Sequence, residues 1–577
     1  MNVLMPIYTE QTQCQDCYKC VRQCPVKAIR VQGGSAAVLP ERCIYCGTCV
    51  NVCPAGAKKV RDDLFRAKAL VQRRPRVVAS LAPSYAAEFA GVAPGALVHA
   101  LKALGFWAVS ETALGAEQVT GACAQALARE PGGLFLSSAC PTAVELVRKY
   151  YPERLPAVTR FLSPVLAHCR LLRQTLGEDL AVVFIGPCIS KKLEADREPR
   201  LLDVALTFAD LRRWFEDQGL DPAAQPAGPG DAFVPGPARE GALYPMDGGM
   251  VRGIQPGADG QARFMAFSGI GNLQEALRDL DRRLEPQDRA LFLELLACEG
   301  GCVNGPRASR ASGTARKWSR VLDRFPDPPE PAAPPTVELD WSAEPEPVAA
   351  AAHDPAELKR ALRALGKTEP GDELNCGGCG YDDCRSLARA LLEGRAEAGM
   401  CVSHMRKLAM NKANALIRAM PSGVVIADED LAIVECNRAF AELMGPECQL
   451  VFEARPGMAG AALAKVAPFS RLFREALDGS GEPIARDLRV GERVIRLMVF
   501  PIEAGHMVGG ILQDITEPSM AREQIIQKAQ EVIRKSVTTV QQIAYLLGEN
   551  AAETELILGS IVEAFQPPPA RAQGEKP

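Results

Sequence analysis

Sixteen of the twenty cysteines in this 577-residue chain fall into closely spaced sets, and this spacing constrains the fold more than any other feature. An iron–sulfur cubane requires about four thiolates, so each set dictates where separate chain segments must meet. The four remaining cysteines stand alone, and we expect them to be small buried hydrophobic residues: Cys123, Cys169, Cys436 and Cys448.

The length and composition of the chain indicate what kind of protein it is. With 577 residues, 47% of them hydrophobic, it is too long for one core, and several domains are expected. The net charge of -4 gives no reason to expect a nucleic-acid partner. We find no charged-then-apolar leader and no apolar run near the ~18 residues of a membrane span. A cytoplasmic protein without a membrane partner is therefore predicted, and there patterned cysteines indicate metal rather than disulfides.

The first set of cysteines is a repeat. Residues 14–25 read Cys-x2-Cys-x2-Cys-x3-Cys-Pro, and residues 43–54 repeat the pattern. It resembles a two-cluster ferredoxin, in which the fourth cysteine of each run crosses to the other cluster. The alternative, a zinc ribbon, explains neither the third cysteine nor the proline. The resemblance implies one 4Fe-4S cluster on Cys14, Cys17, Cys20 and Cys53, and a second on Cys43, Cys46, Cys49 and Cys24.

Three central segments share a second set. They are Ser138-Ala139-Cys140-Pro141, Gly186-Pro187-Cys188 with Lys191 and Glu194, and Glu294-Leu-Leu-Ala-Cys298-Glu-Gly-Gly-Cys302. In this order, with these neighbours, they resemble the signature motifs of the iron-iron hydrogenase large domain. From about Arg76 the pattern alternates apolar strands with amphipathic helices, which predicts an α/β domain. Ala82-Pro83-Ser84, after the predicted strand 77–81, also matches a loop of that family, and the resemblance extends to near Arg310.

The resemblance implies an H-cluster. A cubane would be held by Cys140, Cys188, Cys298 and Cys302, and the Cys302 sulfur would bridge it to a diiron unit with carbonyl and cyanide ligands. Lys191 and Ser84 would contact those ligands, because a buried anionic ligand needs a charge-assisted donor. A plain buried cubane would not need Lys191. Four unrelated buried cysteines are the remaining alternative.

The departures from the family pattern concern proton transfer. Fast hydrogenases carry a cysteine at the position of Ala139, where it passes protons between solvent and the cluster. The stretch Val119–Cys123 supplies neither of the family's two outer glutamates, and Gly186 and Leu296 replace two methionines beside the diiron unit. Since each acid–base group of such a relay is worth ~100-fold or more, we expect slow turnover at an assembled cluster.

A connector and a third cysteine set follow. Residues 325–355 contain nine prolines, which favours an extended, semi-rigid connector over a packed element. Asp354 and Pro355 then predict a helix start. The next pattern is Cys-x2-Cys-x4-Cys-x16-Cys, typical of a small four-cysteine cubane domain, with zinc as the alternative. Because one straight helix would separate the last two cysteines by ~25 Å, the chain must fold back, with Gly394 as the expected helix end. The predicted ligands are Cys376, Cys379, Cys384 and Cys401.

The C-terminal part resembles a PAS sensor domain. Residues 421–440 predict two short strands and a helix, and Asp514-Ile-Thr516 resembles the closing motif of PAS sheets. His506, the one histidine of this domain, is expected at the surface rather than as a haem ligand, and the PAS ligand stays unknown. A following helix with apolar or small residues at steps of three and four over 526–547 predicts a dimer seam. Packing of this helix on the PAS sheet is the alternative. Asn550 and Glu553 predict the start of a second helix.

The predicted fold is therefore a multidomain α/β and α+β chain. Its parts are a two-cluster 4Fe-4S ferredoxin domain (1–72), a hydrogenase H-cluster domain (73–318), a proline-rich linker (319–355), a four-cysteine 4Fe-4S domain (356–408), a PAS domain (409–518) and signalling or dimerisation helices with a tail (519–577). Counting cysteines gives three accessory 4Fe-4S clusters beside the H-cluster.

These features favour a sensory iron-iron hydrogenase of low turnover, which binds or slowly oxidises H2 and passes the redox change to the PAS domain. The alternatives are a ferredoxin-dependent catalytic hydrogenase and a non-catalytic iron–sulfur redox sensor without diiron. The expected partners are H2 and protons, hydrogenase maturases, a second copy of the chain and a downstream signalling protein, and a ferredoxin-like redox partner is compatible with the scheme.

Overall fold

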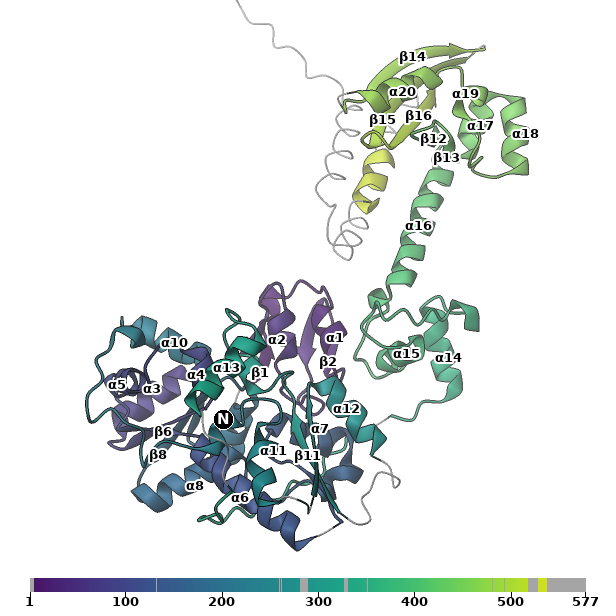
Figure 1. The fold of residues 1–577 in the computed structure, drawn as a ribbon. Coiled ribbons are helices and arrows are strands. Elements are labelled where there is room, and N and C mark those ends of the chain that lie inside the picture. The colour runs from purple at the N-terminus through teal and green to yellow at the C-terminus, as the bar shows by residue number, and fades with distance from the viewer. Residues whose placement is uncertain are drawn as a thin grey trace, which may run out of the picture. The chain divides into compact units, whose positions relative to one another are not determined.

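The computed structural model describes residues 5–130, 132–258, 260, 262–280, 289–325, 331–349, 351–479, 481–491, 493–516 and 528–536. The chain divides into two compact units, Met1–Glu397 and Ala398–Pro577 (Figure 1). The prediction of a multidomain α/β and α+β chain is confirmed. None of the described helices combines the length and the apolar character that crossing a membrane requires.

The first domain is built from two similar halves. Strand β1 (Ile7–Thr9) pairs with β4 (Lys58–Val60), and β2 (Ile29–Gln32) pairs with β3 (Ser35–Val38), all antiparallel. Two short helices, α1 (Lys19–Gln23) and α2 (Thr48–Val52), each carry the third cysteine of a run and end at the fourth. The sequence repeat is therefore also a structural repeat, as expected for a dicluster ferredoxin.

The hydrogenase-type domain contains two parallel sheets. One has the order β6-β5-β8-β9 and the other the order β10-β11-β7. Strands β5 and β8 are fully buried and mainly apolar because both faces of the first sheet are covered by helices (Figure 1). The strands are β5 (Val77–Leu81), β6 (Ala108–Glu111), β7 (Leu134–Leu136), β8 (Ala181–Gly186), β9 (Val204–Thr207), β10 (Ala262–Ser268) and β11 (Ala290–Leu296).

The helices of this domain fill the connections between parallel strands, as crossover units require. Helices α6 and α8 pack against each other along most of their length. The helices are α3 (Leu64–Arg73), α4 (Tyr85–Glu88), α5 (Pro94–Ala103), α6 (Ala113–Arg129), α7 (Pro141–Tyr150), α8 (Pro164–Leu176), α9 (Ser190–Arg197), α10 (Phe208–Asp217), α11 (Gly249–Ile254), α12 (Ile270–Asp279) and α13 (Thr314–Arg324).

A buried ion network joins the ferredoxin domain to the hydrogenase-type domain. Asp63, just before α3, is almost fully buried and accepts hydrogen bonds from Arg61 and from Lys192 Nζ at 3.1 Å. Lys192 also pairs with Asp210, and Arg61 with Asp196 at 2.7 Å. Burial alone would raise the pKa of Asp63, but the Lys192 and Arg61 cations outweigh it and lower that pKa. The network therefore holds α9, directly after Cys188, against the ferredoxin domain.

The proline-rich segment differs from a simple connector. Within residues 331–349, the backbone N–H of Trp341 donates to the carbonyl of Arg160, that of Glu346 to the carbonyl of Arg148 and that of Val348 to the carbonyl of Lys149. The expected boundary at residue 318 also falls inside α13, which continues to Arg324. Proline fixes the extended conformation but does not prevent the other residues from bonding to a neighbour, so residues 331–349 form a strap on the hydrogenase-type domain.

The third cysteine region packs on the ferredoxin domain within the first unit. Helix α14 (Pro355–Ala364) begins at Asp354, whose side chain accepts from the N–H of Ala356. Helix α15 (Cys384–Leu392) ends before Gly394 at φ +65, which is the predicted fold-back. A Cβ on Gly380 would lie 2.9 Å from the backbone N of Arg22, so this region touches α1.

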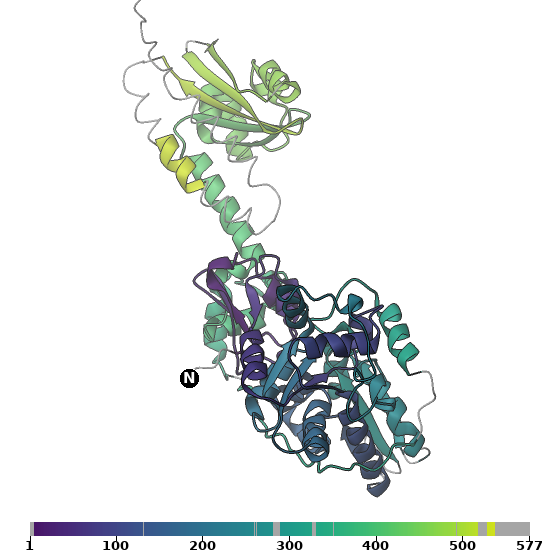
Figure 2. The same cartoon turned by 90° about the vertical axis from the view of Figure 1, so that its left-hand side faces the viewer.

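The second unit contains helix α16 (Val402–Ala419) and a PAS domain (Figure 2). The PAS sheet is antiparallel with the order β13-β12-β16-β15-β14, and Phe440 and Phe473 fill its core. His506 lies at the surface, where it pairs with Glu429 at 2.7 Å. The strands are β12 (Gly423–Asp428), β13 (Ile433–Cys436), β14 (Ile484–Val490), β15 (Arg493–Glu503) and β16 (Met507–Asp514), with helices α17 (Arg438–Met444), α18 (Pro446–Ala454), α19 (Leu463–Val466) and α20 (Ser470–Asp478).

The predictions for the C-terminal tail lie mostly outside the described residues. Residues 528–536 are helical, in agreement with the first predicted helix. The rest of the seam, 526–527 and 537–547, and the second helix from Asn550 are not among the described residues. Dimerisation through this segment stays a prediction.

The ion network generates a stability prediction. Asp63→Asn leaves the buried Lys192 cation with one carboxylate fewer, and we expect it to lower the free energy of unfolding of the first unit by about 3–5 kcal/mol. Because the pKa of Asp63 is lowered by folding, its contribution is present above the unfolded carboxyl pKa of about 4 and is lost as pH falls through the folded value.

Urea unfolding of the full chain at neutral pH measures this effect. Asp62→Asn is the matched control, because Asp62 pairs with Arg213 at the surface and such pairs contribute about 1 kcal/mol or less. Equal losses for the two variants would contradict the role given to the network.

Candidate metal centre

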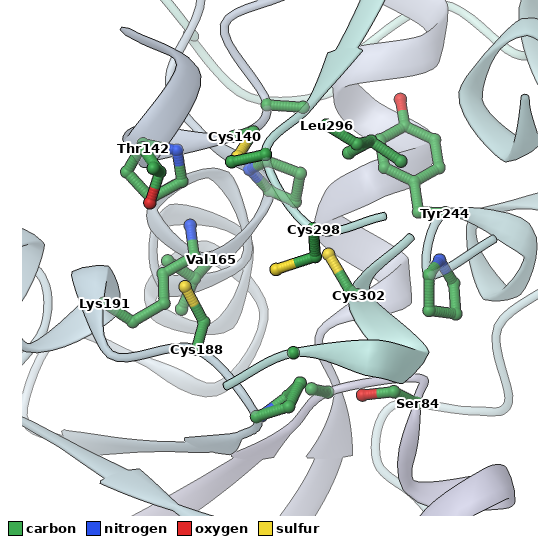
Figure 3. A pocket seen from close by; sticks show the side chains of 18 of the residues that line it. Ser84, Cys140, Thr142, Val165, Cys188, Lys191, Tyr244, Leu296, Cys298 and Cys302 are labelled. Atoms are coloured by element: carbon green, nitrogen blue, oxygen red, sulfur yellow. The ribbon is translucent and has the colours of Figure 1, made fainter. Parts of the chain in front are cut away.

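Four cysteine side chains surround one cavity in the hydrogenase-type domain. Cys140, Cys188, Cys298 and Cys302 line a space of about 100 Å³, and their side chains gather around it in Figure 3. Cys140 follows β7, Cys188 follows β8 and Cys298 follows β11, so each comes from the carboxyl end of a parallel strand. The loop after β5 brings Ser84 to the same place. Ligand sites in parallel sheets form at this edge because the strand ends leave a crevice there.

Placing the four thiols around one cavity is energetically unfavourable without a metal. Burial is the largest cause of the raised pKa of Cys188, to about 11, and of the well-raised pKa of Cys298. The charges of the other cysteines around the cavity raise the pKa values of Cys298 and Cys302 further. Thiolates of like charge in a buried site need a cation between them, and soft sulfur donors suit an iron–sulfur cluster. The donor set therefore fits a cubane.

Lys191 and Ser84 supply polar groups at the cavity. Lys191 is the one charged side chain among the described residues that line it. Its Nζ donates to Ser163 Oγ at 3.2 Å and pairs with Glu194 at 2.5 Å. Ser84 Oγ is buried and has no hydrogen-bond partner within the described part of the chain. A buried hydroxyl without a partner is costly, so Ser84 fits a site that holds an acceptor.

The structure shows where the residues lie that stand in place of the family's proton-transfer groups. Ala139 places a methyl group on the cavity wall, and Leu296 lines the same wall. Ala122 and Cys123 lie buried in α6 and bring no carboxylate. A Cβ on Gly186 would lie 2.5 Å from the Phe184 ring, so this ring takes the space of a larger side chain.

The loop that carries Cys298 and Cys302 is held by α13, which sequence reasoning missed. Buried Lys317 donates from Nζ to Val303 O at 3.0 Å and to Asn304 Oδ1 at 3.1 Å. Trp318 Nε1 donates to Gly300 O at 2.9 Å. No local sequence pattern marks Lys317 as a residue that supports the cysteine loop. The amphipathic pattern of residues 314–324 could have predicted the helix, and this helix crosses the expected domain boundary at residue 318.

The ferredoxin cysteines group as the crossed pattern predicts. Burial raises the pKa of Cys20 to about 11, and Cys17, Cys14 and Cys53 are the cysteines that add to this effect. After burial, the charges that raise the pKa of Cys49 are those of its predicted cluster partners, which are Cys46 and Cys43 of the same run and Cys24 of the first run. Backbone N–H groups also point at the sulfurs, as from Ala28 to Cys24 at 3.2 Å and from Tyr45 to Cys43 at 3.3 Å. The structure thus brings the predicted sets together, and their ligation of iron stays a prediction.

The second ferredoxin set lies against the central cavity. Cys46 is one of the residues that line it, and its charge acts on Cys298. Gly47, at φ +79, permits this approach, because a Cβ there would lie 2.5 Å from Pro306. Buried Lys149 of α7 donates to the carbonyls of Pro40 and Cys43, both at 2.9 Å. Ser190, two residues after Cys188, donates to Tyr45 O at 3.1 Å. The central cysteines and the second ferredoxin loop are therefore held in one rigid arrangement.

The third set is divided by the unit boundary. Cys376, Cys379 and Cys384 belong to the first unit and Cys401 to the second. Joint ligation by these four stays a prediction. The four isolated cysteines are buried, as expected: Cys123, Cys169, Cys436 and Cys448.

The role of α13 can be tested at Lys317. Lys317→Met removes the two hydrogen bonds that Nζ donates to the cysteine loop, and we expect a loss of about four irons per chain from the central site after anaerobic reconstitution. Arg316→Met, at the exposed neighbouring position, is the control and should keep its iron. Iron analysis with electron paramagnetic resonance checks the result, and full iron content in Lys317→Met would contradict the assignment.

Family models match four regions of the chain. The iron only hydrogenase large subunit, C-terminal domain, matches residues 75–306, and a 4Fe-4S dicluster domain matches 6–54. A model described as an Fe–S cluster matches 372–403, and a PAS domain model matches 411–479. The regions coincide with the structural parts that carry the cysteine sets and the antiparallel sheet.

Curated relatives are distant. The NADP-reducing hydrogenase subunit HndD of Solidesulfovibrio fructosivorans is 24% identical over 382 residues, which cover 53% of this chain and 64% of that protein. The periplasmic Fe hydrogenase large subunit of Nitratidesulfovibrio vulgaris is 25% identical over 391 residues, which cover 55% of this chain and 90% of that one. The cytosolic Fe–S cluster assembly factor NAR1 of Sclerotinia sclerotiorum is 28% identical over 137 residues, 20% of this chain and 24% of the relative. Residues 75–306 of the chain are therefore similar to the iron only hydrogenase large subunit, C-terminal domain, and the same polypeptide carries matches to a dicluster 4Fe-4S domain, a further iron–sulfur region and a PAS domain.

Proposed function

We propose that this protein is a sensory iron-iron hydrogenase. It binds or slowly oxidises H2 at an H-cluster and passes the redox change through 4Fe-4S clusters to the PAS domain. Cys140, Cys188, Cys298 and Cys302 would hold the cubane, with Cys302 also bridging to the diiron unit. The observation that carries the proposal is the wall of the cavity, where the cluster ligands are kept and Ala139 replaces the proton-carrying cysteine.

The residues around the cavity support an H-cluster with diiron. When bound, the diiron unit supplies heterolytic cleavage and formation of H2. Lys191 Nζ and Ser84 Oγ offer donors to anionic or polar ligands inside a mainly apolar wall, where charge-assisted bonds are strong. Ala139 can neither give nor take a proton, so proton exchange with solvent limits the rate rather than cluster assembly.

The arrangement of the cysteine sets supports a path for electrons. The central site lies against the Cys46 set, and the two ferredoxin sets share one small domain. Gly380, between Cys379 and Cys384, lies against α1, which carries Cys20. In sequence, Cys401 directly precedes α16, which leads into the PAS domain. Three accessory clusters would thus connect the hydrogen site to a sensor module, with the downstream partner and the PAS ligand unknown.

Two other functions use parts of the same structure. A ferredoxin-dependent catalytic hydrogenase requires fast proton exchange, which Ala139 opposes. The similarity to an Fe–S cluster assembly factor favours the second candidate, a non-catalytic iron–sulfur protein without diiron. Lys191 and the unpartnered Ser84 favour diiron over this candidate. A cytoplasmic location, maturases that insert the diiron unit and dimerisation through the C-terminal helices belong to the proposal.

The rate limit can be tested at Ala139. Ala139→Cys restores a titratable group on the cavity wall and should raise hydrogen evolution of maturated protein by about tenfold, less than a complete relay because the outer glutamates are absent. Ala139→Val enlarges the side chain without adding a group that can carry a proton, and it should stay at the native rate. A native rate equal to that of a fast hydrogenase would contradict the sensory function.

Signal transfer can be tested at the third cysteine set. A redox change at the third cluster can shift α16 only if the oxidised and reduced forms of that cluster interact differently with the helix. We therefore expect amide hydrogen exchange in α16 and in 528–536 to differ between H2-reduced and oxidised protein. Cys379→Ala should abolish this difference, and Cys169→Ala, which changes an isolated buried cysteine, should keep it. Identical exchange in both redox states of the native protein would disconnect the PAS domain from the hydrogen site.

A further inference from the structure

A chain of polar groups leaves the cavity on the side away from Lys191. Tyr244 lines the cavity beside Leu296 (Figure 3), and its hydroxyl lies 2.9 Å from Thr120 Oγ1 of α6. Thr120 is fully buried and Tyr244 nearly so. The Thr120 hydroxyl donates to the carbonyl of Ala116 at 2.9 Å, so the Tyr244 hydroxyl is the donor to Thr120 Oγ1. A phenol on the wall of an otherwise apolar cavity is thus hydrogen-bonded away from the cavity, into the protein.

Two carboxylates continue this chain toward the surface. Glu240 opens a short helix, Glu240–Leu243, that packs on α6. A Cβ on Gly253 of α11 would lie 3.6 Å from both Thr120 Oγ1 and Glu240 Cγ, so the two side chains flank one point over Gly253. Glu240 is buried, and its Oε2 accepts no hydrogen bond from the described residues. No direct hydrogen bond joins Thr120 and Glu240 among the described residues, so this step of the path requires a water molecule between them.

Glu117 completes the chain at the surface. It lies one turn before Thr120 on α6, is half-buried, and accepts a hydrogen bond from the N–H of Arg239, whose own side chain is exposed. Burial is the largest cause of its raised pKa, about 7, and the carboxylates of Glu240 and Glu111 raise it further while Arg239 opposes them. Glu117 can therefore exchange a proton with solvent near neutral pH.

We propose that Tyr244, Thr120, Glu240 and Glu117 form the proton path between the cavity and solvent, in place of the absent relay cysteine. This inference rests on the proposed function, because it needs hydrogen chemistry in the cavity. Tyr244 is the catalytic residue of the path, since it alone of the four lines the cavity, and the others pass the proton on.

The steps balance without an added reagent. A proton released in the cavity binds to Tyr244 Oη as the phenolic proton moves to Thr120 Oγ1. The Thr120 hydroxyl turns from the Ala116 carbonyl and passes its proton through a water molecule to the carboxylate of Glu240. Glu240 passes a proton to the nearby carboxylate of Glu117, and Glu117 releases it to solvent. Rotation of the two hydroxyl groups restores the starting state, and the reverse sequence delivers a proton to the cavity.

A second polar chain does not reach solvent. Thr112, which also lines the cavity, bonds to Ser80, and His168 links Ser80 to Ser110 with bonds of 2.8 Å. Burial lowers the pKa of His168 to about 3, and Ser80, Ser110 and His168 are fully buried. This chain ends inside the sheet and serves to hold β5, β6 and α8 together.

The path is tested with maturated full-length protein by exchange between D2 and solvent protons. Tyr244→Phe keeps the ring and removes the hydroxyl, and we expect exchange to fall about tenfold or more while the carbonyl and cyanide infrared bands stay unchanged. Thr120→Val should have the same effect. This second variant keeps the path testable if Tyr244→Phe fails to fold. Tyr151→Phe is the control, because the Tyr151 hydroxyl bonds to Gln274 O away from the cavity. Ala139→Cys added to Tyr244→Phe should restore exchange by opening the other route.

A second readout does not depend on activity. In infrared difference spectra of the full chain, a protonated carboxyl band should titrate near pH 7 and disappear in Glu117→Gln. Native exchange rates in both Tyr244→Phe and Thr120→Val, or a carboxyl band unaffected by Glu117→Gln, would overturn the path. Absence of carbonyl and cyanide bands from the native protein would instead overturn the proposed function, so the two failures are distinguishable.

Discussion

The structure depends on bringing four buried thiols to one point. Cys188, Cys298 and Cys302 resist ionisation because they are buried and because neighbouring thiolates would carry the same charge. Only a bound cation relieves this, so the fold must place the four sulfurs before the metal arrives and hold them afterwards. Two parallel sheets achieve the placement, because three of the cysteines follow the carboxyl ends of β7, β8 and β11, and α13 fixes the loop of the fourth. The apolar wall around them leaves Lys191 as the charge at the site.

The same constraint explains how the ferredoxin domain is attached. The Asp63–Lys192 network lies directly after the Cys188 segment, and Lys149 and Ser190 hold the loop around Cys46. Buried ion pairs contribute little net stability but break at a high cost. These interactions therefore fix the position of one predicted cluster site relative to the next. Gly47 permits the closest approach between the two domains.

Much of this organisation could be predicted from the sequence, because cysteine spacing encodes which segments must meet. The crossed ferredoxin sets and the central four thiols follow from the resemblance to known cluster motifs, and the fold-back at Gly394 follows from the short distance between ligands that a cubane imposes. What spacing does not encode is the support around the ligands. Lys317 and Trp318 lie past the expected boundary, the strap at 331–349 bonds through its backbone, and Tyr244 meets Thr120 only through tertiary packing. These contacts join residues far apart in sequence, and no local pattern marks them.

The central claim is that the cavity holds diiron and that this site responds to H2 slowly. Infrared spectroscopy of anaerobically maturated protein, recorded while H2 is added and removed, tests it most directly. The account predicts carbonyl and cyanide bands that shift reversibly with H2, together with turnover far below that of a fast hydrogenase. A spectrum without these bands, in protein whose four cubanes are fully loaded with iron, would contradict it.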